Sequence, residues 1–190
     1  MLSSSRSKPA AVRGVIGAAP QGRLSERRRL DTRLRNFYRV ECRDKNGSVK
    51  WVEEVENLVC TAGATDLLAK YFQGSAYTAA WYVGLYQGTG TLATSDTMAS
   101  HAGWTETTGY SNANRPALTL GTPASGSVNN SGSVAVFNIN ATNTILGAFV
   151  CTNNTIGGTT GILYGEAAFS ASRSVASGDT LNVTMTLTAS

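Results

Sequence analysis

Few residues in this sequence of 190 have the types and spacing that catalysis or metal binding requires. His101 is the only histidine, and the stretch TMASHAGWTE around it contains neither a metal-ligand partner nor a serine nucleophile motif. Cys42, Cys60 and Cys151 are far apart and form no CxxC or Cys/His pairing that would bind zinc. We therefore expect no catalytic residues, no metal site and no cofactor, and we do not expect an enzyme.

Two further patterns resemble chemical sites only superficially. Glu53, Glu54 and Glu56 look like an acid cluster, but on a strand Glu54 and Glu56 would share one face while Glu53 takes the other. We interpret them as a solvated or subunit-facing hairpin edge. The glycine-rich QGTGTLA at 87–93 lacks the Gly-Lys-Ser/Thr ending of a phosphate-binding loop, so we interpret it as a hairpin turn.

The odd number of cysteines favours reduced thiols buried in the core. Reduced thiols are typical of a protein assembled in a reducing cytoplasm. The sequence shows no charged-then-apolar signal peptide and no apolar run long enough to cross a bilayer, so we expect no membrane contact.

Charge is distributed unevenly along the chain. Residues 1–39 contain ten Lys or Arg and two acidic residues, a net charge of +8, whereas the remainder contains six basic and ten acidic residues, a net charge of −4. A basic segment of this kind is typical of proteins that bind an acidic partner, either nucleic acid or a carboxylate-rich protein surface. A solvated, disordered tail and an organellar transit peptide are the alternatives.

We interpret residues 1–36 as a basic arm. Pro9 and Pro20 favour an extended chain at its start, whereas Ser25 as a helix N-cap, followed by leucines at helical spacing, predicts a short basic helix up to Phe37. Guanidinium groups pair well with carboxylates, so we expect this arm to dock on a protein rather than on nucleic acid. The expected partner-binding residues are Arg23, Arg27, Arg28, Arg29, Leu30, Arg33, Leu34 and Arg35.

The body, residues 37–190, is predicted to begin with a β-hairpin over 37–56, because two alternating segments flank the strong turn signal Asn46-Gly47. One helix follows at about 62–72. We expect its apolar face to be buried, and that face consists of Leu67, Leu68, Tyr71 and Phe72.

The rest of the body, residues 57–190, is rich in short alternating segments separated by Gly, Asn and Ser. The last of them, LNVTMTL at 181–187, places apolar residues on one face and polar residues on the other. This pattern predicts a mainly β protein, an antiparallel β-sandwich of jelly-roll-like type. The weakly charged strand faces favour self-association, with a trimer or a dimer expected.

The order of motifs from about Asn57 to Leu187 resembles a group of small β-sandwich structural proteins from tailed bacteriophage virions. The resemblance rests on an N-x-V…G helix, a W-x-E…Y…R segment and a closing R-x-V-x-x-G-D-x-L, here NLVCTAG, WTETTGYSNANR and RSVASGDTL. It implies a non-enzymatic virion subunit, assembled in the host cytoplasm and bound to other virion proteins.

Within that group we expect a capsid decoration (cement) protein that binds neighbouring subunits through its basic arm. A neck, tail or fibre-anchoring structural protein is the alternative. A glycan-binding module is a further alternative, and it would require Trp81, Tyr82 or Trp104 to be exposed in a groove, where aromatic rings stack on sugars.

Overall fold

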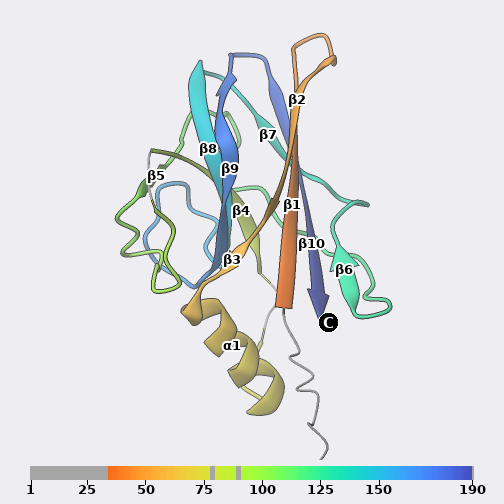
Figure 1. Ribbon diagram of the computed structural model, residues 1–190, viewed down its shortest axis with the longest axis vertical. Coiled ribbons are helices and arrows are strands. Elements are labelled where there is room, and N and C mark those ends of the chain that lie inside the picture. The colour runs from red at the N-terminus through yellow and green to blue at the C-terminus, as the bar shows by residue number, and fades with distance from the viewer. Residues whose placement is uncertain (1–33, 78–79, 89–90, 190) are drawn as a thin grey trace, which may run out of the picture. The chain divides into compact units, whose positions relative to one another are not determined.

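The protein is a sandwich of two antiparallel sheets, seen in a computed structural model that describes residues 34–77, 80–88 and 91–189 (Figure 1). Sheet A has the order β2 (Val49–Glu56), β1 (Leu34–Arg43) and β10 (Thr180–Ala189), with β6 (Ser127–Asn129) and β7 (Ala135–Asn138) both paired to β10. Sheet B has the order β3 (Leu58–Val59), β9 (Leu163–Val175), β8 (Asn143–Cys151), β4 (Tyr82–Gly88) and β5 (Trp104–Glu106). The predicted antiparallel sandwich is confirmed.

The predicted hairpin is strands β1 and β2. The Asp44 carboxylate accepts hydrogen bonds from the backbone N–H groups of Asn46 (2.8 Å) and Ser48 (2.9 Å), and Gly47 adopts φ +84°. A side chain at Gly47 would be strained in this left-handed conformation, which explains why the Asn-Gly signal marks the turn.

Strand β1 begins at Leu34, three residues before the expected start of the body. The predicted helix up to Phe37 is therefore wrong for residues 34–37, and its earlier part lies outside the described residues. Tertiary contacts explain the difference, because β1 pairs with β10 along its whole length, from Leu34 opposite Ala189. Asn36 is also fully buried, and its carbonyl accepts the N–H of Asn57 at 2.7 Å. These contacts outweigh a helical spacing of leucines.

The main core lies between the two sheets and follows the period-two alternation of the strands. On β10, Leu181, Val183 and Met185 are completely buried. Their neighbours on β1, Tyr38 and Val40, are buried as well, so the middle of the inner face of sheet A is apolar where β1 pairs with β10. The three cysteines are buried and unpaired, as predicted.

A second, smaller core covers the outer face of sheet B. Here two glycines each face an aromatic ring on the neighbouring strand: Phe149 of β8 lies over Gly84 of β4, and Tyr86 of β4 lies over Gly147 of β8. A side chain at either glycine would overlap the ring, so these glycines make space for the aromatic layer. Residues 91–103, which we call the covering loop, close this layer from outside through Met98 and neighbouring residues.

Helix α1 (Thr61–Phe72) lies at the end of the sandwich opposite the β1–β2 turn (Figure 1). It packs against β9 through Gly63, where an added Cβ would lie 2.5 Å from the Tyr164 carbonyl oxygen. The helix is confirmed, but the prediction that its apolar face is buried is wrong. Exposure is 41% for Leu67, 55% for Leu68, 80% for Tyr71 and 75% for Phe72.

Candidate functional site

An apolar groove of about 340 Å³ runs between α1 and the open end of the sandwich. Core residues of both sheets form its floor, including Val150 and Tyr164 of sheet B and Met185 of sheet A. Leu67 of α1 lines one side, and Trp81 lines another. The groove is therefore a place where the interior of the sandwich reaches the surface, and we call it the α1 groove.

Exposed apolar side chains surround the α1 groove. Tyr71 lies in its lining, and the ring of Phe72 contacts Tyr71 edge-on with ring centroids 4.9 Å apart. Tyr77, also in the lining, is 54% exposed. A contiguous group of large apolar residues open to water is uncommon on a monomer and marks surfaces that bind something.

The charges beside the α1 groove balance each other. Asp66 and Lys70 lie one helical turn apart on α1, with the Lys70 ammonium 3.9 Å from the Asp66 carboxylate. The Lys70 ammonium also donates a hydrogen bond to the Ala76 carbonyl at 2.7 Å. The groove thus combines apolar walls with a neutral rim, which suits an uncharged, apolar ligand.

The predicted partner-binding residues fall mostly outside the described part of the chain. Arg23, Arg27, Arg28, Arg29, Leu30 and Arg33 all lie there. Leu34 and Arg35 are the first two residues of β1. The Arg35 guanidinium pairs with Glu56 of the same sheet, with an Nε–Oε1 distance of 2.9 Å, and lies 5.3 Å from the centre of the Phe37 ring. Arg35 is thus engaged within its own sheet.

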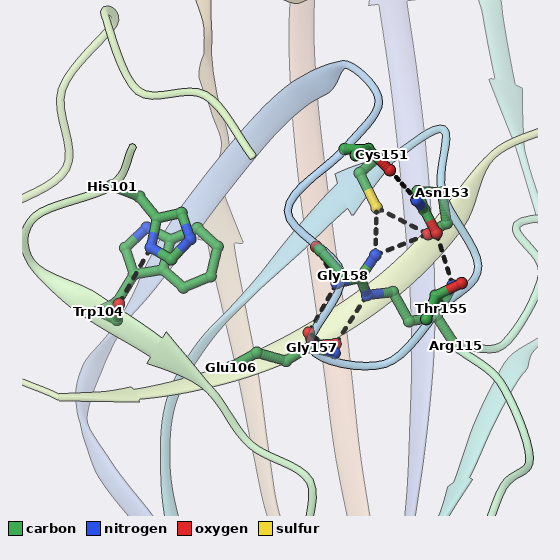
Figure 2. A network of polar contacts seen from close by, with 10 residues as sticks. His101, Trp104, Glu106, Arg115, Cys151, Asn153, Thr155, Gly157 and Gly158 are labelled. Carbon is green, nitrogen blue, oxygen red and sulfur yellow. Dashed lines mark hydrogen bonds and ion pairs between the residues drawn. The ribbon is translucent and has the colours of Figure 1, made fainter. Parts of the chain in front are cut away.

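The three aromatic residues considered for glycan stacking are placed differently from one another. Trp104 is only 4% exposed, and its indole N–H donates to Glu166 at 2.8 Å, so it cannot stack on a sugar. Trp81 lines the α1 groove, but its N–H donates to the Tyr77 hydroxyl at 2.7 Å, and Tyr82 is half-buried. His101 stacks on Trp104 with ring centroids 3.7 Å apart (Figure 2).

The acidic residues of β2 lie on opposite faces, as the alternation predicted. Glu54 and Glu56 are exposed on the outer face, but Glu53 is buried and forms an ion pair with Arg173 of β9. The interpretation of Glu53 as part of a solvated edge is therefore wrong. Burial alone would raise the pKa of Glu53, but the hydrogen bonds from Arg173 and Ser170 lower it below its ordinary value.

A buried ion pair that sequence reasoning missed connects strand β5 with two loops, the one that contains Arg115 and the loop 152–161. The Arg115 side chain is completely buried, and it pairs with both carboxylate oxygens of Glu106, at 2.7 Å and 2.6 Å (Figure 2). Its other N–H groups donate to the carbonyls of Asn153 (2.7 Å) and Gly158 (3.0 Å). Every strong polar contact of this guanidinium is internal, so Arg115 holds the loop 152–161 rather than a ligand.

The outer face of sheet A divides into a charged half and an uncharged half. On β1 and β2 it carries ion pairs such as Arg39 with Glu41 at 2.9 Å. On β10 it carries Thr184, Thr186 and Thr188. The expectation of weakly charged strand faces is thus confirmed for β10 and wrong for the hairpin strands.

In the part of the chain that the structure describes, no three His, Cys, Asp or Glu side chains gather in a way that could hold a metal ion. Nor does that part contain a helix long and apolar enough to cross a membrane. The chain matches no protein-family model, and no curated protein shows significant similarity to it.

Proposed function

We propose that this chain is a non-enzymatic structural protein of a tailed bacteriophage virion, a capsid decoration (cement) protein that binds neighbouring subunits. One observation carries the proposal: α1 presents Leu68, Tyr71 and Phe72 to water beside an apolar groove. The order of motifs that resembles virion proteins spans the same body, from about Asn57 to Leu187.

The surface at α1 has the composition of an interface core. Aromatic residues are enriched at such cores and unpaired charges are depleted, and both features hold at Tyr71, Phe72 and the neutral Asp66–Lys70 pair. Burying an exposed Leu or Phe side chain contributes about 1.5–3 kcal/mol, so a few such residues suffice for a specific contact. The occupant that fits is an uncharged segment with leucine-like or aromatic side chains on a neighbouring virion subunit.

The same assembly explains two other features. The threonine-rich half of sheet A offers an uncharged surface for a second copy of the chain, which supports a homo-oligomer. The basic N-terminal segment then reaches acidic surface on another subunit, where carboxylates pair with its arginines. In this arrangement the rigid sandwich supplies stability, and its end and its arm supply the contacts.

Replacing two exposed residues tests the proposal. Tyr71→Asp and Phe72→Asp place charge where the partner would exclude water, so we expect each variant to fold normally and to bind purified particles at least tenfold more weakly. Val49→Asp is the control, because Val49 is 49% exposed and lies at the start of β2, next to the hairpin turn.

Binding is measured by co-sedimentation with particles that lack the protein, and the occupied position is read from a cryo-EM map. Full binding by the Tyr71→Asp and Phe72→Asp variants would contradict the role of the α1 groove. A map that places the protein on the neck or tail would replace the decoration role with an anchoring one.

A further inference from the structure

Buried carboxylates in this protein usually have a cation beside them. Glu53 pairs with Arg173, Glu106 pairs with Arg115, and Asp179 pairs with Lys50 at 2.5 Å. Asp96 and Glu166 are the exception: both are buried, and no salt bridge to either is found among the residues that the structure describes.

Glu166 is held in a fixed orientation with one oxygen unsatisfied. It projects from β9 into the small core outside sheet B and is completely buried. Its Oε2 accepts the indole N–H of Trp104 at 2.8 Å, whereas its Oε1 has no hydrogen-bond donor. Such an orphaned oxygen costs free energy unless a partner supplies a proton.

Asp96 of the covering loop is the acidic neighbour that raises the pKa of Glu166, and it is buried as well. Its Oδ2 accepts the backbone N–H of Ala93 at 3.1 Å, which fixes the carboxyl group against the loop. Two adjacent carboxylates without a cation repel each other at low dielectric, and one of them then keeps its proton. A shared proton would also satisfy the orphaned Glu166 oxygen.

Two other titratable groups packed around Glu166, a thiol and a phenol, carry no positive charge in either protonation state. Cys60, at the start of α1, and Tyr86 of β4 are both completely buried, and burial raises the pKa of the Cys60 thiol to about 12 and also raises the pKa of the Tyr86 hydroxyl. His101 stacks on Trp104, and its Nδ1 lies 3.0 Å from the Trp104 carbonyl oxygen. Burial, followed by the contact with Asp96, raises the pKa of Glu166 to about 7.

We propose that Glu166 and Asp96 share one proton in the folded protein, and that this carboxyl pair is a latch that holds the covering loop until the proton is lost. In the latched state the proton lies between a Glu166 oxygen and an Asp96 oxygen. On opening, the proton passes to water, and two carboxylate charges remain face to face. No oxidant or further reactant takes part.

The state of the latch affects the start of α1, because the covering loop caps this helix. The backbone N–H of Thr61, the first residue of α1, donates to the Thr94 carbonyl at 2.8 Å, and Cys60 at the N-cap makes no side-chain capping bond. A looser loop therefore leaves the start of α1 without its partner. This device goes beyond the proposed function, and its test requires no virion partner.

Glu166→Gln separates the two states of the latch. The glutamine amide donates a hydrogen bond to Asp96 at every pH, and its carbonyl still accepts the Trp104 N–H, so the variant imitates the protonated acid. A carboxyl whose folded pKa lies above its unfolded value contributes stability that is present below the unfolded value, ordinarily 4.5, and is lost as pH rises towards the folded one.

In urea unfolding of the full chain, the wild-type folding equilibrium constant should therefore decline between about pH 4.5 and pH 7, approaching tenfold per pH unit, and level off above. The Glu166→Gln variant should lack this decline. At pH 8.5, hydrogen exchange at residues 93–97 should be at least tenfold slower in the variant than in the wild type.

Glu53→Gln is the matched control, because Glu53 is also a buried glutamate but is paired with a cation. Above pH 4.5, the ordinary pKa of a glutamate, the Glu53→Gln variant should be less stable than the wild type, because the ion pair with Arg173 is lost. It should still show the decline in the folding equilibrium constant between about pH 4.5 and pH 7, because Glu166 is unchanged. Asp96→Asn is a second variant in case Glu166→Gln fails to fold, and it should move the decline to lower pH. An unchanged decline in Glu166→Gln or Asp96→Asn, or equal loop exchange in Glu166→Gln and wild type, would overturn the latch.

Discussion

At the scale of single residues, the buried charges of this sandwich act in pairs that join distant parts of the chain. Arg115 lies in the loop after β5, and its guanidinium contacts Glu106 of β5 and two carbonyls of the loop 152–161. Glu53 of β2 similarly meets Arg173 of β9 and so connects the two sheets. A buried ion pair contributes little net stability over an apolar pair, but removal of one partner leaves the other charge stranded.

Arg115→Met should therefore destabilise the protein by about 3–5 kcal/mol, because Glu106 would keep a buried charge without its cation. Urea unfolding at pH 7 measures the loss. The double variant Arg115→Met/Glu106→Leu should recover part of it, since neither charge then remains buried. Arg35→Met is the control. Arg35 pairs with Glu56, and both side chains are about half exposed, so we expect little change in the free energy of unfolding. Equal losses in the two single arginine variants would contradict this account of burial.

At the scale of elements, strands β4 and β8 are matched by an exchange of glycine and aromatic residues. Phe149 fills the space that Gly84 leaves, and Tyr86 fills the space that Gly147 leaves. Trp104 then packs on both rings, with centroid distances of 5.1 Å to Tyr86 and 4.8 Å to Phe149. Cross-strand pairs of this kind specify the register of the two strands as well as stabilising them.

Gly84→Ala should cost about 1–3 kcal/mol, because the new methyl group overlaps the Phe149 ring and overpacks the layer. Phe149→Ala should cost about 3–5 kcal/mol through the cavity that it leaves. The double variant should be less destabilised than the sum of the two, since each change relieves the other. Gly132→Ala, at a position with no atoms within 4 Å of an added Cβ, is the control and should be nearly neutral. Strict additivity in thermal or urea unfolding would show that Gly84 and Phe149 do not share this space.

At the scale of the whole molecule, charge separates the N-terminal segment from the sandwich. Residues 1–33 carry eight basic and two acidic residues, a net charge of +6, whereas residues 34–190 carry eight basic and ten acidic residues, a net charge of −2. The sandwich strands begin at Leu34, so a deletion that tests the arm must end at residue 33 and leave β1 intact. The opposite signs are consistent with the proposed docking of the arm on acidic surface of another subunit.

Charge reversal by Arg28→Glu/Arg29→Glu should weaken incorporation into particles, and the wild-type contact should weaken as salt rises, because salt screens exposed charges. Deletion of residues 1–33 should leave the body folded and abolish incorporation. Co-sedimentation with particles at several salt concentrations measures both effects. Lys45→Glu in the exposed hairpin turn changes the same kind of charge and should have little effect. If the arm instead binds free duplex DNA with a steep salt dependence and without particles, the protein-docking prediction is wrong.

Local chemistry in the sequence by itself determined much of the fold. The alternation in LNVTMTL specified a half-buried strand, Asn46-Gly47 specified the hairpin turn, and a change to helical spacing specified α1. These features depend on residues that are neighbours along the chain, and for that reason a single sequence is enough to predict them. Strands β3 and β6, of two and three residues, are too short for a period to show, and they were missed.

Only the tertiary structure decided which surfaces are covered and which charges meet. Periodicity showed that α1 has an apolar face, but α1 rests on β9 through Gly63 instead, and that face stays in water beside the groove. Leu34 became the start of a strand because β10 offered it a partner. The pairs Arg115 with Glu106 and Asp96 with Glu166 join separate loops and strands. Which side chains are buried and which charges pair depends on how elements distant in the sequence pack together. Local sequence patterns do not specify that packing.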